Sequence, residues 1–132
     1  MKTIYKNFII NSTYKGDKPA EWGKIHNCNN HRITVMNTEN GKRTSFDFWA
    51  SLANPEIKTD NDNISAFGCF LSDATAGEYD FDTFCNEFGY DSPSKAYHTW
   101  KECQKATNKA KRLIGDMDKL YDVYNDILEL GL

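Results

Sequence analysis

Bulky and β-branched side chains are concentrated at the start of the chain, in the pattern of a half-buried strand. We expect one strand over residues 2–14. Gly16 and Pro19 are expected to end this strand, because glycine and proline interrupt extended structure and favour turns. A second extended segment is expected over residues 21–28, followed by a polar turn over residues 27–31.

The clearest local pattern in this half is a hairpin centred on Asn40-Gly41. These two residues tolerate the positive φ angles of a type I′ turn, so a two-residue loop is expected. The expected cross-strand pairs are Glu39 with Lys42, Asn37 with Thr44, Val35 with Phe46, and Ile33 with Phe48. This register places the large apolar side chains on one face. Three or four antiparallel strands are therefore predicted within residues 1–49.

From Asp62 onward the spacing of hydrophobic residues lengthens to three and four, which indicates helices. A first helix is expected over residues 62–72, with Asp62 as its cap. A second is expected over residues 81–88, preceded by Asp80 at the N-cap position. Gly89 then suits the left-handed backbone that often follows a helix.

The longest predicted helix covers about residues 92–114, with Ser92 as its cap and Pro93 at its first position. Its expected buried stripe consists of Ala96, Trp100, Cys103, Ala106 or Thr107, Ala110 and Ile114. Gly115 predicts a break, although a continuous kinked helix also fits the pattern. A last helix over residues 116–130 is expected to bury Met117, Leu120, Tyr121, Tyr124, Ile127 and Leu128, and to expose Asp118, Asp122, Asp126 and Glu129.

Strands precede helices along the chain, and this order predicts an α+β domain with helices on one face of a small antiparallel sheet. A chain of 132 residues buries one core without metal or disulfide staples. We expect a single domain over residues 1–132, with a β-rich half at 1–49 and a helical half at 62–130. Apolar runs are far shorter than the ~20 residues of a membrane helix, so a soluble, cytoplasmic protein is expected.

The net charge of −3 conceals four segments of alternating sign. Residues 1–45 carry 8 basic and 3 acidic side chains, whereas residues 46–91 carry 1 basic and 10 acidic ones. Residues 92–115 carry 6 basic side chains and 1 acidic one, and residues 116–132 carry 1 basic and 5 acidic side chains. Segregated charge predicts binding surfaces more than it predicts a fold.

Two sets of charged residues are therefore candidate binding sites. The acidic block 46–91 predicts a patch for a basic partner, and the equally weighted alternative is that several of its carboxylates, with Asp62, Asp80 and Asp91 as examples, are caps and turn residues. The acidic set of candidate binding residues comes from this block. Its members are Asp47, Glu56, Asp60, Asp73, Glu78, Asp82 and Glu87. The basic set, Lys101, Lys105, Lys109 and Arg112, recurs at helical spacing and predicts either nucleic-acid contact or a solvated helix face. Tyr97 and Trp100 lie nearby as candidate stacking surfaces.

One short cluster, His26-x-Cys28-x-x-His31, has residue types that bind metals. A structural zinc site needs a fourth ligand and usually a paired Cys-x-x-Cys, and the cluster lacks both. A polar turn is therefore the favoured interpretation, and we expect no metal and no other cofactor.

The four cysteines are spaced like hydrophobic residues and not like a disulfide framework. Buried thiols are the favoured interpretation. A nucleophilic Cys85 or Cys103 with His98 as its base is the minor alternative, which would need the groups to meet in space. Without a phosphate-binding glycine loop or another catalytic signature, we expect a protein that is not an enzyme.

The second and third helices are linked by the motif Phe81-x-x-Phe84-Cys85-x-x-Phe88-Gly89-Tyr90-Asp91-Ser92-x-Ser94-x-Ala96. This motif resembles one found in small, largely uncharacterised proteins of bacteriophages and related mobile elements. Phe46-Asp47-Phe48-Trp49 and residues 67–74 are also similar, so the resemblance covers about residues 31–114. Pro93 replaces an acidic residue expected in the turn. The motif carries no catalytic residue.

The resemblance implies a function, because small phage proteins include stoichiometric inhibitors of host defence, anti-CRISPR proteins among them. We expect a phage-encoded, non-enzymatic inhibitor that binds a CRISPR effector in the host cytoplasm through charged surfaces. A Cas9-type effector is favoured because 13 asparagines and many lysines suit an AT-rich genome. The alternative is a nucleic-acid-binding phage accessory protein that uses the lysine-rich helix.

Overall fold

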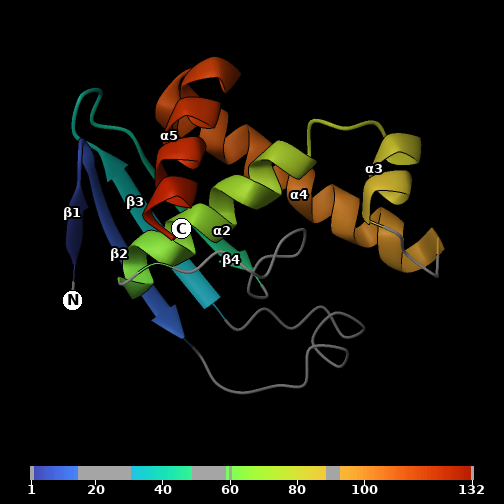
Figure 1. The fold of residues 1–132 in the computed structure, drawn as a ribbon, viewed down its shortest axis with the longest axis horizontal. Coiled ribbons are helices and arrows are strands. Elements are labelled where there is room, and N and C mark those ends of the chain that lie inside the picture. The colour runs from blue at the N-terminus through green and yellow to red at the C-terminus, as the bar shows by residue number, and fades with distance from the viewer. Residues whose placement is uncertain (1, 15–30, 49–58, 60, 89–92, 132) are drawn as a thin grey trace.

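The computed structural model describes residues 2–14, 31–48, 59, 61–88 and 93–131, which form an α+β fold (Figure 1). Its strands are β1 (Thr3–Tyr5), β2 (Phe8–Tyr14), β3 (His31–Asn37) and β4 (Arg43–Phe48). Its helices are α2 (Asp62–Ala76), α3 (Phe81–Phe88), α4 (Pro93–Ile114) and α5 (Met117–Leu130). The predicted fold class and the predicted order of strands before helices are confirmed.

The strands form an antiparallel sheet in the order β1-β2-β3-β4. The prediction of one strand over residues 2–14 was wrong, because Tyr5 pairs with Phe8 and the chain reverses at the two residues between them. Lys6 adopts a φ of 52°, a left-handed conformation that lysine seldom takes and that its sequence does not signal. The predicted segments over residues 21–28 and 27–31 lie outside the described residues, except that His31 begins β3.

The hairpin of β3 and β4 is confirmed, but its register differs from the prediction by two residues. The observed pairs include Ile33 with Phe46, Val35 with Thr44 and His31 with Phe48, so the loop comprises residues 38–41 and not Asn40-Gly41 alone. A shift of two residues preserves the face to which each side chain points. Ile33, Val35 and Phe46 are accordingly all buried, as the pattern predicted.

Polar side chains in the hairpin loop and at the end of β3 explain the register of the hairpin. The side-chain oxygen of Asn37 accepts from the Glu39 amide at 3.0 Å, and that of Asn40 accepts from the Lys42 amide at 2.9 Å. Both asparagines also donate to the carbonyl oxygen of Leu113, at 3.0 and 3.1 Å. The end of α4 therefore holds the loop in place, and this tertiary contact has no local sequence signal.

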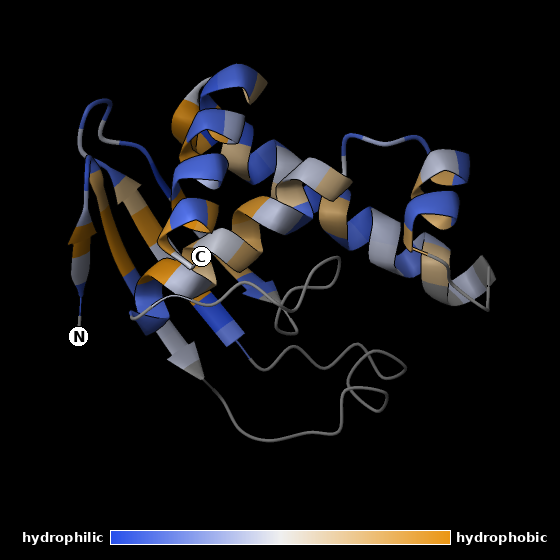
Figure 2. Ribbon diagram, viewed as in Figure 1, coloured by the Kyte–Doolittle hydropathy of each residue, from blue (hydrophilic) through white to orange (hydrophobic). Residues whose placement is uncertain are grey.

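The main hydrophobic core lies between the sheet and a layer made by α2, α5 and the second half of α4 (Figures 1 and 2). Aromatic rings join the two layers, since the centroids of Phe8 and Phe67 lie 5.0 Å apart and those of Phe46 and Phe70 lie 5.2 Å apart. Fully buried residues of this core include Ile10, Ile33, Val35, Leu71, Leu113, Leu120 and Ile127.

A second, smaller core lies beyond the sheet, where α3 packs on the first half of α4 (Figure 1). Phe84 of α3 is completely buried there with Ala76 and Cys103. Phe88 and Trp100 are partly buried against this cluster. We call α3 and the first half of α4 the arm. Its two helices are held together by the hydrophobic contacts of this second core.

The start and end of α2 both differ from the predicted helix. Asn61, not Asp62, is its N-cap, with its side chain accepting from the amides of Asn63 and Ile64 at 2.9 and 3.1 Å. The helix continues to Ala76 instead of ending near residue 72. Because it is buried on nearly every side, its hydrophobic positions show little helical periodicity.

The starts of α3 and α5 agree with the predictions. The Asp80 carboxylate accepts from the Thr83 amide at 2.8 Å, and this hydrogen bond lowers the pKa of Asp80. Gly115 takes a φ of 125° and Asp116 caps α5, so the predicted break is confirmed over a continuous helix. Gly89 and Ser92 lie outside the described residues.

Candidate functional site

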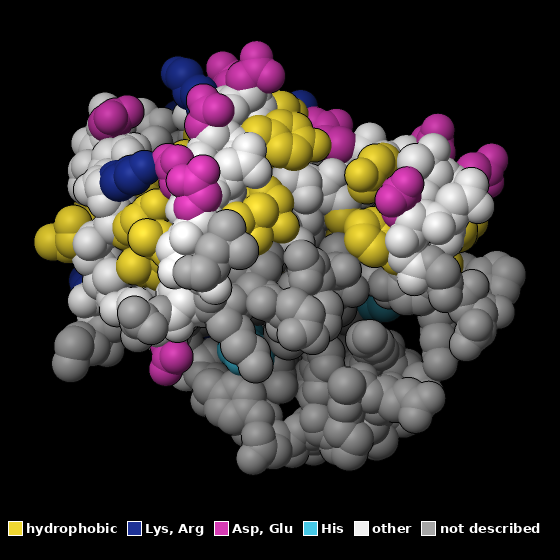
Figure 3. Space-filling model, viewed as in Figure 1, with side chains coloured by type: hydrophobic (Ala, Val, Ile, Leu, Met, Phe, Trp, Pro, Cys, Tyr) yellow, Lys and Arg dark blue, Asp and Glu magenta, His cyan; other side chains and the backbone are white. Residues whose placement is uncertain are grey.

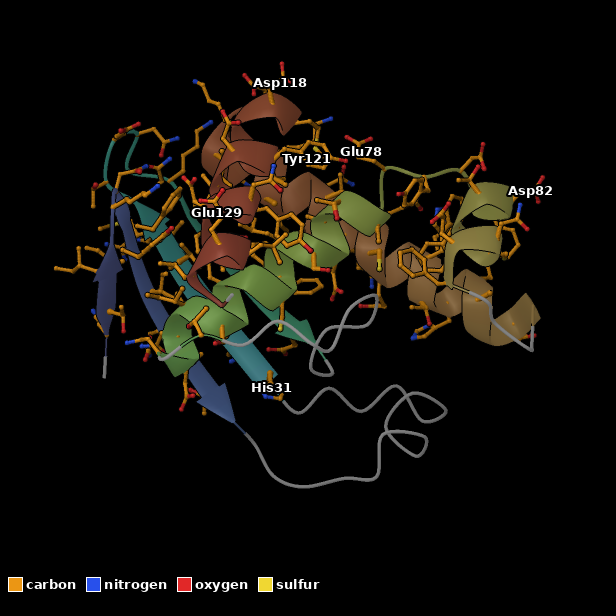
Figure 4. The ribbon with its side chains drawn as sticks, viewed as in Figure 1. His31, Glu78, Asp82, Asp118, Tyr121 and Glu129 are labelled. Carbon is orange, nitrogen blue, oxygen red and sulfur yellow. The ribbon has the colours of Figure 1, made fainter. Side chains whose placement is uncertain are left out.

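Two acidic segments that are distant in the sequence meet on one side of the molecule. Glu78, in the loop between α2 and α3, lies 3.8 Å from the Lys111 ammonium of α4. Burial raises the pKa of Tyr121 on α5, and the nearby Tyr79 and Glu78 raise it further. Figure 4 shows Tyr121 beside Glu78, between the Asp118 end of α5 and the Asp82 end of α3. The α2–α3 loop and α5 therefore border one another.

We define the acidic face as five exposed carboxylates: Glu78, Asp82, Asp118 and Glu129, which Figure 4 labels on this side, and Asp122, which lies one helical turn from Asp118. Acidic side chains gather over α5 and α3 in the view of Figure 3. Residues 77–88 contain no lysine or arginine, and α5 contains Lys119 alone. The face therefore carries more acidic than basic side chains, although Lys111 pairs with Glu78 and Lys119 lies on α5.

The predicted acidic residues do not all contribute to this face. Glu78, Asp82 and Glu87 are exposed, whereas Asp47 is paired with Arg32 at 2.8 Å on the sheet. Asp73 is completely buried in α2, so its assignment to a binding surface is corrected. The assignment failed because α2 packs against the sheet, α4 and α5 at once and has almost no outer face. Glu56 and Asp60 lie outside the described residues.

Sequence reasoning did not assign the α5 carboxylates to a binding site. It predicted that they point outward, and Asp118, Asp122 and Glu129 are exposed. Tyr121 was expected to be buried, but its side chain is 41% exposed. The available signal was the excess of acidic residues in 116–132. The sequence did not show that these residues lie beside Glu78, which only the fold reveals.

The basic candidates lie along one strip of α4, as predicted, and we call this strip the basic ridge: Lys101, Lys105, Lys109 and Arg112. All four side chains are exposed. The Lys105 ammonium lies 3.0 Å from a Glu102 carboxylate oxygen, and Lys109 donates to the Ser45 carbonyl on β4 at 2.7 Å. Lys109 therefore marks the point at which the ridge passes β4, and Lys101 lies at the other end of the ridge, beside α3.

An aromatic groove opens where α3 meets the start of α4. It has a volume of about 620 Å³ and is lined by Phe81, Ser94, Tyr97, His98 and Lys101. Lys101 is the first member of the basic ridge, so the groove and the ridge are continuous. The predicted stacking residues thus lie beside the predicted basic residues.

The structure does not support Cys103 as a nucleophile. Its thiol is completely buried in the second core, and burial raises its pKa, with Asp73 and Glu102 adding to the effect. His98 instead lines the aromatic groove, about 140° away from Cys103 around α4. The two groups therefore do not form the predicted thiol–imidazole pair. Cys85 is half-buried on α3, and Cys28 lies outside the described residues.

Alkylation of the native protein should distinguish its thiols. Burial raises the pKa of Cys69 to about 12, with Asp73 adding to the effect, so Cys69 and Cys103 hold no appreciable thiolate near neutral pH. We expect both to resist iodoacetamide at pH ~8 and to react once urea unfolds the chain. Peptide mass spectrometry measures this directly. Rapid native labelling of Cys103 would contradict a closed second core.

Of the three candidate metal ligands His26, Cys28 and His31, only His31 lies among the described residues. His31 is half-buried at the start of β3, and burial lowers its pKa. His26 and Cys28 lie outside the described residues. Among the residues that are described, no three His, Cys, Asp or Glu side chains come together in a way that would hold a metal ion.

None of the described helices combines the length and the apolar character that a membrane span requires. Comparison of the chain with protein-family models, with curated proteins and with solved structures finds no match. The acidic face, the basic ridge and the aromatic groove are the candidate functional surfaces of the described residues.

Proposed function

We propose that this protein is a non-enzymatic inhibitor that binds a host defence complex through its acidic face. The observation that supports the proposal is that Glu78, at the start of the acidic residues 78–88, borders the acidic helix α5 on one exposed side. A negative surface of this kind fits a partner that is basic because it normally holds nucleic acid.

Charge complementarity raises the association rate at such an interface and its selectivity among partners. Opposite potentials accelerate diffusional encounter and disfavour partners with negative surfaces. Tyr121 adds an exposed aromatic ring among the carboxylates, and tyrosine is enriched at the energetically important centres of interfaces. The acidic face therefore combines long-range attraction with a candidate anchor for short-range packing.

A CRISPR effector, with a Cas9-type effector first, is the partner that we propose. Such effectors hold the guide–target duplex in a positively charged channel through its backbone. An acidic protein seated in that channel would exclude nucleic acid without any chemical step. The resemblance of residues 31–114 to phage proteins supports this choice of partner, as does the charge of the face.

The experiment is a binding measurement with a purified, guide-loaded Cas9-type effector at low and high salt. We expect binding, and we expect D118N/D122N to slow association about fivefold at low salt, because long-range attraction acts mainly on the association rate. High salt should reduce the difference by screening. Expression of the protein in cells should also relieve CRISPR interference.

The matched control is E39Q/D62N, which removes two exposed carboxylates away from the acidic face. Asp62 stands in the first turn of α2 as Asp118 does in the first turn of α5, so the effects on helix stability are comparable. We expect association at the native rate from this control. Absence of a complex together with intact interference, or equal slowing by both variants, would refute the proposal.

A further inference from the structure

Three aromatic rings from two helices form a cluster at the outer end of the arm. The ring centroid of Phe81 lies 5.7 Å from that of Tyr97 and 5.4 Å from that of Trp100, and Tyr97 and Trp100 are 5.8 Å apart. Trp100 is held in place because its indole N–H donates to the Tyr79 carbonyl at 2.9 Å. Tyr97 is 43% exposed. A fixed aromatic platform therefore presents one ring to the outside.

A positive charge lies directly over this platform. The Lys101 ammonium is 5.4 Å from the centroid of Tyr97 and 5.2 Å from that of Trp100, within the range of a cation–π contact. The groove around it, about 620 Å³ in volume, also contains the hydroxyl of Ser94 and the imidazole of His98. A site with a ring face, a cation and hydrogen-bonding groups suits a planar, negatively charged ligand, and its volume is that of a small-molecule pocket.

The basic ridge leads away from the groove along α4. Lys101, Lys105 and Lys109 recur every four residues, which on a helix places them about 6 Å apart along the axis. With Arg112 the ridge extends over roughly 16 Å. Successive phosphates of an extended strand have comparable spacing, so a strand whose base enters the groove would lay its backbone along these side chains.

We propose that the aromatic groove and the basic ridge bind single-stranded nucleic acid, with a base stacked on Tyr97 and phosphates paired with the ridge. An unpaired strand is favoured over a duplex because only an unstacked base offers its π-face to the ring. This inference goes beyond the acidic face and does not depend on it. It is tested on the purified chain with nucleic acid alone, so its failure is distinguishable from failure of the proposed function.

The experiment is fluorescence anisotropy with a labelled oligothymidylate of about ten nucleotides, within the range of single-strand site sizes. Tyr97→Leu should weaken binding about tenfold, because it removes the stacking face while keeping an apolar side chain. Tyr97→Phe keeps the ring and should retain native affinity. Comparison of the two variants therefore separates the loss of ring stacking from any general effect of substituting Tyr97.

Salt dependence tests the ridge. Each phosphate contact to a single strand contributes about 0.7 to the slope of log K against log salt, so K101Q/K105Q/K109Q should reduce the slope by about 2. The control K2Q/K42Q/K119Q removes three exposed lysines elsewhere and should leave the slope unchanged. No binding by the native chain at low salt, or native affinity in Tyr97→Leu, would overturn the proposal. Equal competition by heparin, a polyanion without bases, would also overturn it.

Discussion

Substitution of Gly77 by alanine is expected to destabilise this protein by about 3 kcal/mol, near the upper end of the effects of overpacking. A β-carbon at this position would lie 2.2 Å from the Thr107 hydroxyl oxygen, 2.3 Å from the Cys103 carbonyl oxygen and 2.5 Å from the Cys103 carbonyl carbon. Two of these three atoms belong to the α4 backbone, which cannot rotate away. The end of α2 would therefore have to separate from α4.

Urea unfolding measures the effect, and two comparisons isolate its cause. The φ of Gly77 is −69°, a conformation open to any residue, so the predicted loss is purely steric. Gly41→Ala meets no atom within 4 Å and carries only the strain of a φ of 72°, so about 1 kcal/mol is expected. Thr107→Ala should not rescue Gly77→Ala, because the Cys103 carbonyl remains. Rescue, or a loss no larger than that of Gly41→Ala, would contradict this account.

Gly77 also illustrates what the sequence could not predict. A glycine after a helix usually indicates a left-handed C-cap. Here the glycine is required by the close approach of a second helix some thirty residues later in the chain. Local patterns identified the helix starts at Asp80 and Asp116, because capping depends on neighbouring residues, although for α2 they chose Asp62 in place of the adjacent Asn61. They missed contacts that depend on the tertiary fold.

The same division applies to the candidate sites. The basic ridge was predictable because its residues lie on one amphipathic helix whose spacing fixes a common side. The acidic face was not, since it joins the α2–α3 loop to α5, and the sequence carries no signal that Glu78 lies near Tyr121. Two burial predictions were wrong for a related reason: Asp73 was expected to be exposed and is buried, and Tyr121 was expected to be buried and is exposed. Burial on α2 and α5 is decided by how many elements cover each helix, not by periodicity alone.

Phe84→Ala is expected to release α3 while leaving the main core folded. Phe84 is completely buried, and with Ala76 and Cys103 it forms the second core. Removal of a buried phenylalanine ring costs about 3–5 kcal/mol, and a helix of 8 residues has no stability of its own in water. The amides of α3 should therefore lose protection in hydrogen exchange, whereas those of β2, β3 and α2 should remain protected.

Phe67→Ala provides the matched comparison in the main core, where the ring contacts Phe8. It should lower the global free energy of unfolding by about 3–5 kcal/mol, which is a large part of the 5–15 kcal/mol typical of a domain. The two variants should also differ in function. Because α3 carries Asp82 of the acidic face and Phe81 of the groove, Phe84→Ala should weaken both proposed interactions under conditions in which the main core is intact. If hydrogen exchange showed that both variants open the same amides, the two cores would be one cooperative unit, and the arm could not be treated as a separately stabilised binding element.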